Sequence, residues 1–117
     1  MRKLFFLSIT FFALLLASCG GSYEKVSLSK EDVSSGETVV VDVRSVDEWK
    51  NDGHADCALN IPLPELESHL DSLRKFEKVI LVCRSGNRAG SAMNLLTDAG
   101  FKNVENHGSW KNIECTP

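Results

Sequence analysis

Residues 78–90 read KVILVCRSGNRAG, an apolar run that ends on a cysteine and passes into a short polar turn. The run is apolar without alternation, which predicts a strand covered on both faces, as in a parallel sheet. From residue 87 to residue 99 apolar side chains return at helical spacing, and Gly100 follows as the residue that ends the helix. The side chains expected to face inward are Ala89, Ala92, Met93 and Leu96. The stretch therefore predicts a strand, a tight turn and a helix, with Cys83 at the end of the strand.

The rest of the chain repeats this alternation of strands and helices. Strands are expected at residues 26–28, 38–43, 59–61 and 102–105, from their apolar and β-branched content. Helices are expected after the N-cap residues Ser29 and Ser45, and from Pro64, where Leu66, Leu70 and Leu73 share one face. Trp110 and Ile113 are placed on a terminal helix. This order predicts an α/β fold with a central, mostly parallel sheet flanked by helices on both faces.

The turn after Cys83 has the composition of an anion-binding loop. Ligands of parallel sheets bind at the carboxyl ends of strands, and Cys83 occupies such an end. The N–H groups that open the next helix lack helical partners, and the helix dipole favours negative charge there. Donors, positive charge and backbone freedom come from Arg84, Ser85, Gly86, Asn87 and Arg88. The turn therefore favours a thiolate nucleophile at Cys83, with a buried inert thiol as the alternative.

The motif CRSGNR after an apolar strand resembles the active loop of single-domain rhodaneses, the thiosulfate sulfurtransferases. Three further segments resemble that family in the same order: VVVDVRSVDEW at 39–49, GHADCALNIP at 53–62 and AGFKNVENHGSW at 99–110. One departure is Cys57, at a position where the family carries glycine. The resemblance covers nearly all of residues 26–117 and implies a rhodanese-like domain there.

The resemblance implies a reaction and a role for each site residue. The Cys83 thiolate would take the outer sulfur of thiosulfate or a similar small anionic donor, release sulfite, and hold a persulfide. A thiophilic acceptor, or an acceptor protein, would then remove that sulfur. Arg84 would assist the approach of the donor, Arg88 would brace the loop, and Asp42 and Arg44 would fix neighbouring backbone and charge. No cofactor and no metal ion is expected.

Other functions stay open from the sequence. Cysteine phosphatases use a Cys-x5-Arg loop, whereas four residues separate Cys83 from Arg88 here, and the shorter loop suits one sulfur atom better than a tetrahedral phosphate. One alternative is an exported thiol–disulfide redox protein in which Cys83 reacts with Cys57 or Cys115. Another is a rhodanese-like module that binds sulfur or a partner protein without catalysis.

The first residues predict export and lipid attachment. MRK precedes the uncharged run LFFLSITFFALLL at 4–16, which as a helix would rise about 20 Å, less than the ~30 Å of a bilayer. LASC at 16–19 resembles the bacterial lipobox, which implies cleavage before Cys19 and lipid on its thiol. We therefore expect a signal peptide at 1–18, a tether at 19–25 and a domain at 26–117. A signal anchor is the alternative.

The lipobox implies a location in the bacterial cell envelope. The mature protein would be lipid-anchored on the periplasmic face, and glycines rather than an acidic residue after Cys19 favour the outer membrane. Oxidising compartments permit disulfides, so a bond between Cys57 and Cys115 and two unpaired thiols both stay open.

Composition and histidine spacing argue against nucleic acid and zinc as partners. With a net charge of −3, the chain has no excess of positive charge with which to bind nucleic acid. The length of 117 residues suits one domain, and we expect a monomer. His54, His69 and His107 match no zinc-binding spacing.

Overall fold

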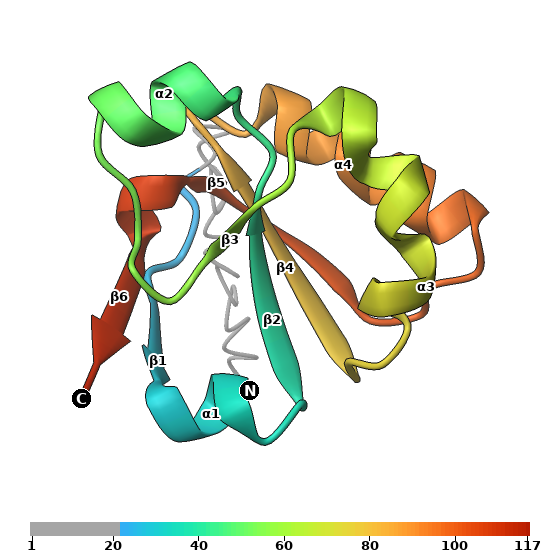
Figure 1. The fold of residues 1–117 in the computed structure, drawn as a ribbon, viewed down its shortest axis with the longest axis horizontal. Helices are drawn as coiled ribbons and strands as arrows, with labels where there is room; N and C mark the ends of the chain where they lie inside the picture. The colour runs from blue at the N-terminus through green and yellow to red at the C-terminus, as the bar shows by residue number, and fades with distance from the viewer. Residues whose placement is uncertain (1–21) are drawn as a thin grey trace, which may run out of the picture.

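Four parallel strands form the central sheet of this computed structural model, which describes residues 22–117 (Figure 1). Their order across the sheet is β3 (Leu59–Asn60), β2 (Thr38–Asp42), β4 (Lys78–Cys83) and β5 (Val104–Ser109). A separate two-stranded parallel sheet pairs β1 (Val26–Ser29) with β6 (Ile113–Thr116).

Short helices connect the strands. They are α1 (Lys30–Ser34), α2 (Val46–Asn51), η1 (Leu63–His69), α3 (Leu70–Leu73), α4 (Asn87–Asp98) and η2 (Trp110–Asn112), where η marks a 3-10 helix. Ser29 forms a capping box with Asp32 at the start of α1, and Ser45 caps α2 by accepting the Glu48 N–H. Gly100 ends α4 with a φ of +95°. The N-caps and the stop residue agree with the expectations from sequence.

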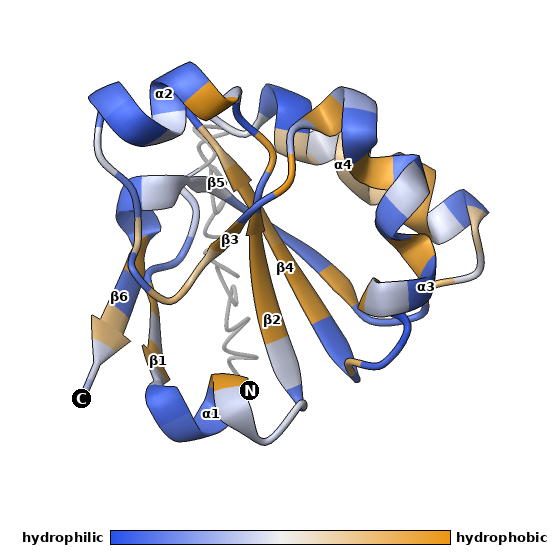
Figure 2. Cartoon of the chain, in the orientation of Figure 1, coloured by the Kyte–Doolittle hydropathy of each residue, from blue (hydrophilic) through white to orange (hydrophobic). Residues whose placement is uncertain are grey.

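The two faces of the central sheet pack against different layers. β2 and β4 are paired in register, so Val39 and Val41 lie on the same face as Val79 and Leu81. On that face they pack against Leu66, Leu73, Ala89, Ala92 and Leu96 of η1, α3 and α4. The opposite face buries Val40, Ile80 and Val82 against Leu28, Ala55, Ala58 and Ile113, with Trp49 and Trp110 at its margin. β2 and β4 are accordingly the most apolar strands in Figure 2.

The strand order creates a switch point between β2 and β4. The chain leaves β2 for β3 on one side of the sheet and leaves β4 for β5 on the other side. In open parallel sheets, ligands bind outside the carboxyl ends of the strands that flank such a point. Asp42 and Cys83 stand at these two ends.

Two expectations about helices were wrong. Residues 63–69 form a 3-10 helix, and only Leu70–Leu73 is α-helical. Pro64 supplies no N–H, and the Ser68 hydroxyl donates to the Glu65 carbonyl, so local bonds compete with an α-helical ladder. Leu66 and Leu73 are nevertheless buried on the face that their spacing predicts.

The terminal helix is a 3-10 turn followed by a strand. Trp110 lies in η2, whereas Ile113 begins β6 and pairs with Val26 of β1. The spacing of three residues between Trp110 and Ile113 is compatible with a helix and with a turn followed by a strand. The second arrangement forms because β1 offers an unpaired edge to which residues 113–116 bond as a parallel strand. β5 also starts at Val104 and runs to Ser109, later and longer than expected.

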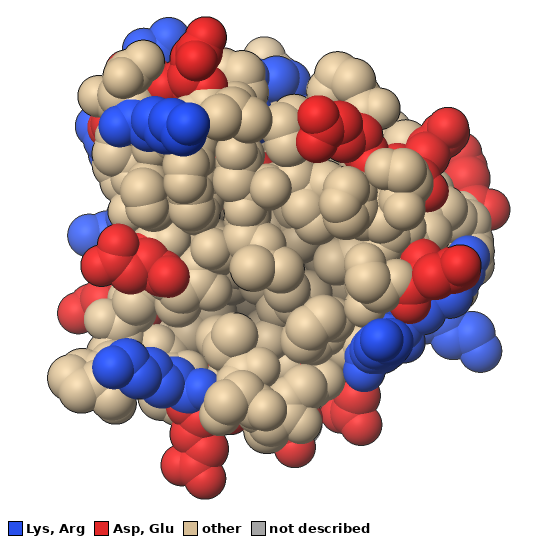
Figure 3. Space-filling model, viewed as in Figure 1, with Lys and Arg blue, Asp and Glu red and all other residues tan. Residues whose placement is uncertain are grey.

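Charged side chains of both signs are interspersed on the face shown in Figure 3, around an uncharged centre. The predicted signal peptide and Cys19 lie outside the described residues and stay predictions. Within residues 22–117, no helix combines the length and hydropathy that a bilayer crossing needs.

Candidate active site

The Cys83 thiol lies in a cradle of backbone donors. Cys83 is buried at the end of β4, and its Sγ accepts the N–H of Gly86 at 3.0 Å and that of Ala89 at 3.4 Å. Both donors belong to the turn and the first residues of α4. Donors converging on one sulfur stabilise negative charge there.

The backbone turns sharply at Gly86. Its φ of +102° is in the left-handed region, which a side chain rarely adopts, and it serves as the N-cap of α4. A Cβ at this position would also lie 2.6 Å from the hydroxyl oxygen of Tyr23. Glycine is therefore needed for the turn, and it also leaves room for the Tyr23 side chain.

Asn106 of β5 fixes the turn from the neighbouring strand. Its Nδ2 donates to the Gly86 carbonyl at 3.0 Å, while its Oδ1 accepts the Gly108 N–H at 2.9 Å. The sequence interpretation missed this residue. An asparagine two residues before a glycine is a signal for a local side-chain turn, but nothing in the sequence shows that its amide reaches the loop.

Arg88 joins the start of α4 to α2. Its two terminal nitrogens donate to the two carboxylate oxygens of Glu48 at 2.6 and 2.8 Å. Hydrogen bonding from Arg88 lowers the pKa of Glu48 to about 2. The same bond raises the pKa of Arg88, and the negative charge of Glu48 adds to that effect. Glu48 is thus the partner of Arg88, and the bracing role of Arg88 stays a prediction.

Asp42 and Arg44 form a buried ion pair beside the loop. Arg44 Nη2 lies 2.7 Å from Asp42 Oδ2 and donates to the Gly53 carbonyl at 2.8 Å. The guanidinium carbon stands 4.9 Å from the ring centroid of Trp110. Asn60 Nδ2 donates to the carbonyls of both Asp42 and Arg44. These contacts join Asp42 and Arg44 to neighbouring backbone and to each other, and none of them involves the sulfur.

The remaining loop residues, Arg84, Ser85 and Asn87, are exposed on the turn. Arg84 lines a small cavity at the carboxyl end of the sheet. The backbone donors of the loop therefore face the sulfur, whereas these three side chains are exposed.

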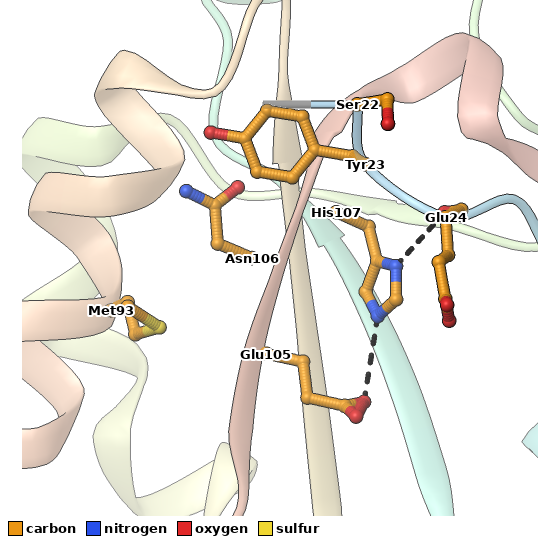
Figure 4. A pocket seen from close by; sticks show the side chains of 7 residues that line it. All are labelled: Ser22, Tyr23, Glu24, Met93, Glu105, Asn106 and His107. Carbon is orange, nitrogen blue, oxygen red and sulfur yellow. Dashed lines mark hydrogen bonds and ion pairs between the residues drawn. The ribbon is translucent and has the colours of Figure 1, made fainter. Parts of the chain in front are cut away.

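Residues 22–24, which belong to the predicted tether, pass over the loop. Tyr23 lies close to both Gly86 and Gly108, where a Cβ would collide with its ring. Figure 4 shows Tyr23 above Asn106, with His107 beside Glu24 and Glu105. His107 Nδ1 is 3.1 Å from the Glu24 carbonyl, and its Nε2 is 3.5 Å from Glu105 Oε2. Residues 22–24 thus pack on β5 and the active loop.

The other two cysteines of the described chain are joined. Cys57 and Cys115 form a disulfide with their Cα atoms 5.7 Å apart, which links the segment before β3 to β6. Cys83 is the free cysteine of residues 22–117. The cysteine that replaces the family's glycine therefore has a structural partner, and Cys83 has no free thiol partner in this part of the chain.

The histidines take structural positions. The His54 ring stacks on Trp49 with centroids 3.8 Å apart. Its Nδ1 lies 2.8 Å from the Trp49 carbonyl. Over residues 22–117, no group of three or more His, Cys, Asp or Glu side chains is placed to hold a metal ion.

Comparisons with known proteins agree on one family. Residues 26–114 match the rhodanese-like domain family. The chain is 36% identical over 103 residues to a candidate mitochondrial thiosulfate sulfurtransferase of Schizosaccharomyces pombe, covering 75% of this chain and 72% of the relative. It is 32% identical over 75 residues to the thiosulfate sulfurtransferase PspE of Escherichia coli, covering 62% and 71%. A solved rhodanese with anions from E. coli superposes with a TM-score of 0.59 at 31% identity, covering 68% of this chain and 94% of that one. The fold, its cysteine loop and these matches together show that the chain belongs to the rhodanese-like domain family.

Proposed function

We propose that this protein is a sulfurtransferase that carries sulfane sulfur as a Cys83 persulfide. The observation that supports this most directly is the Cys83 Sγ with two backbone N–H donors, at 3.0 and 3.4 Å, at the start of α4. Such preorganised donors stabilise charge on a covalent intermediate without reorganising during the reaction.

The first half-reaction uses thiosulfate or a similar donor. The Cys83 thiolate attacks the outer sulfur of thiosulfate, a new S–S bond forms, and the donor's own S–S bond breaks. The bonding electron pair leaves with sulfite, so a thiolate and a dianion become a persulfide anion and a dianion. In the second half, the acceptor nucleophile attacks the outer persulfide sulfur, and the electron pair returns to Cys83.

The acceptor and the location follow the predictions from sequence. Cys83 is buried, so the acceptor must reach the outer sulfur with a small nucleophilic group. A thiol, cyanide or a side chain of an acceptor protein can supply that group. We place the reaction on the periplasmic face of the bacterial envelope, with Cys19 lipidated. Cell fractionation tests that placement: Cys19→Ala should release the protein from membranes, and unchanged attachment would contradict the lipid anchor.

Intact mass spectrometry tests the sulfur chemistry. The protein, with its Cys57–Cys115 disulfide left intact, is incubated with thiosulfate, desalted and weighed before and after cyanide. We expect a gain of one sulfur atom that cyanide removes as thiocyanate, and no gain for Cys83→Ser. An adduct that persists in Cys83→Ser, or no adduct in the wild type, would exclude the proposal. An adduct that cyanide does not discharge would also contradict the proposal, because the outer sulfur of a persulfide reacts with cyanide.

A further inference from the structure

Two glycines at the active loop are buried although they carry no side chain of their own. Gly86 is buried between the exposed residues Ser85 and Asn87, and Gly108, near the end of β5, is buried between partly exposed neighbours. Both have positive φ values, +102° and +72°. A Cβ on either glycine would collide with the side chain of Tyr23. The Tyr23 side chain therefore covers both glycines.

The two glycines belong to one hydrogen-bonded unit. Asn106 Nδ2 donates to the Gly86 carbonyl at 3.0 Å, and Asn106 Oδ1 accepts the Gly108 N–H at 2.9 Å. The Gly86 N–H in turn donates to the Cys83 sulfur at 3.0 Å. Figure 4 shows the Tyr23 ring above Asn106. One side chain thus covers the residues that place the Gly86 N–H on the sulfur.

The backbone that follows Tyr23 is fastened to β5 and to β1. His107 Nδ1 donates to the Glu24 carbonyl at 3.1 Å, since a carbonyl can only accept (Figure 4). Two residues after Glu24, Val26 begins β1, which pairs with β6. These contacts limit how far Tyr23 can move from the loop.

The contact between Tyr23 and the glycines consists of packing. The Tyr23 atoms nearest to the Cβ position of Gly108 are ring carbons, and at Gly86 they are the hydroxyl oxygen and the two ring carbons next to it. A glycine Cα has no polar group to which the hydroxyl could bond. Tyr23 is 42% exposed, so it covers the loop from the surface and is not part of the core. A phenylalanine ring would reproduce most of this contact.

We infer that Tyr23 is a positioning residue for sulfur transfer, whose ring holds Gly86 and Gly108 in place and thereby keeps the Gly86 N–H on the Cys83 sulfur. The inference rests on the proposed function, because it takes Cys83 as the residue that carries sulfur. Glycine has more conformational freedom than other residues, so a cover against it removes alternative conformations. The ring also excludes water, and a hydrogen bond is stronger in a low dielectric. Tyr23 lies before β1, outside the cysteine loop and ahead of the segments that resemble rhodaneses.

Amide hydrogen exchange, followed by NMR, tests the positioning without any sulfur donor. Tyr23→Ala should speed exchange of the Gly86 amide about tenfold, while the amide of Ile80, in the middle of β4, should keep its wild-type rate. Tyr23→Phe keeps the ring and should exchange like the wild type. An unchanged Gly86 rate in Tyr23→Ala would overturn the inference. Equal increases at Gly86 and Ile80 would overturn it too, since they would indicate a loss of overall stability.

Single-turnover kinetics measure the consequence for the reaction. Tyr23→Ala should slow persulfide formation at saturating thiosulfate about fivefold, which is the effect of losing about one hydrogen bond. The thiosulfate concentration that gives half of the maximal rate should change little, because Tyr23 acts through Gly86 and not on the donor. Tyr23→Phe should form the persulfide at the wild-type rate. A defect in Tyr23→Phe equal to that in Tyr23→Ala would contradict a role of the ring.

The matched control is Lys25→Ala, which removes an exposed side chain two residues further along the same segment. It should leave Gly86 exchange and persulfide formation unchanged, and effects equal to those of Tyr23→Ala would overturn the assignment to Tyr23. The exchange experiment also separates this inference from the proposed function. Faster Gly86 exchange in Tyr23→Ala would support the positioning role even if the wild type forms no persulfide. Persulfide formation at the wild-type rate in Tyr23→Ala would overturn the inference and leave the proposed function intact.

Discussion

The Arg88–Glu48 ion pair allows a quantitative prediction about the loop. Glu48→Gln removes the carboxylate that receives both terminal nitrogens of Arg88 at 2.6 and 2.8 Å. Lowering the pKa of that carboxyl from 4.5 to about 2 corresponds to about 3 kcal/mol, at about 1.4 kcal/mol per pKa unit. The side chains of Arg88 and Glu48 are 37% and 25% exposed, so solvent screening reduces the contribution. We expect Glu48→Gln to lower the free energy of unfolding by about 1–2 kcal/mol near neutral pH.

The pH dependence of this loss has a definite sign. The folded-state pKa of Glu48 is depressed, so its contribution is complete above about pH 4.5 and is lost as the pH falls toward about 2. The stability difference between wild type and Glu48→Gln should therefore fall below half of its neutral value by about pH 3.

Urea unfolding at several pH values measures both quantities. Glu67→Gln is the matched control, since Glu67 is an exposed carboxylate on η1, and it should change stability by less than about 0.5 kcal/mol. Two results would refute the reasoning: equal stabilities of the two variants at neutral pH, or a Glu48→Gln deficit that stays constant down to about pH 3.

Two further predictions concern the support of the loop. Asn106→Asp keeps the acceptor for the Gly108 N–H but loses the donor to the Gly86 carbonyl. Persulfide formation should therefore slow at least about fivefold in a single-turnover assay. An unchanged rate would show that this hydrogen bond does not position the turn. Replacing Cys57 and Cys115 by serine opens a cross-link between residues 58 apart in sequence, which should cost about 4 kcal/mol in urea unfolding. Persulfide formation at the free Cys83 should be unchanged in that double variant, and its loss would implicate the disulfide in the chemistry.

Local sequence patterns predicted the segments whose conformation depends on neighbouring residues. The apolar run 78–82, the glycine at 86 and the helix after it were predicted as the structure has them, because each depends on neighbouring residues. The caps at Ser29 and Ser45 were predicted for the same reason. The α/β class followed from the alternation of strands and helices, and the rhodanese-like fold followed from the resemblance.

Contacts between distant segments could not be read from the sequence. Glu48 meets Arg88 across 40 residues and Asn106 meets Gly86 across 20, and a single chain shows neither pairing. The strand at Ile113 was mistaken for a helix because its partner, β1, lies at the other end of the described chain.

The central claim is that transferred sulfur resides on Cys83. Peptide mapping by mass spectrometry, after thiosulfate treatment under non-reducing conditions, locates the added sulfur directly. The account predicts one additional sulfur on the peptide that contains Cys83, an unchanged Cys57–Cys115 peptide pair, and one thiocyanate formed for each sulfur that cyanide removes. Sulfur inserted between Cys57 and Cys115, or an unmodified Cys83 peptide, would contradict it.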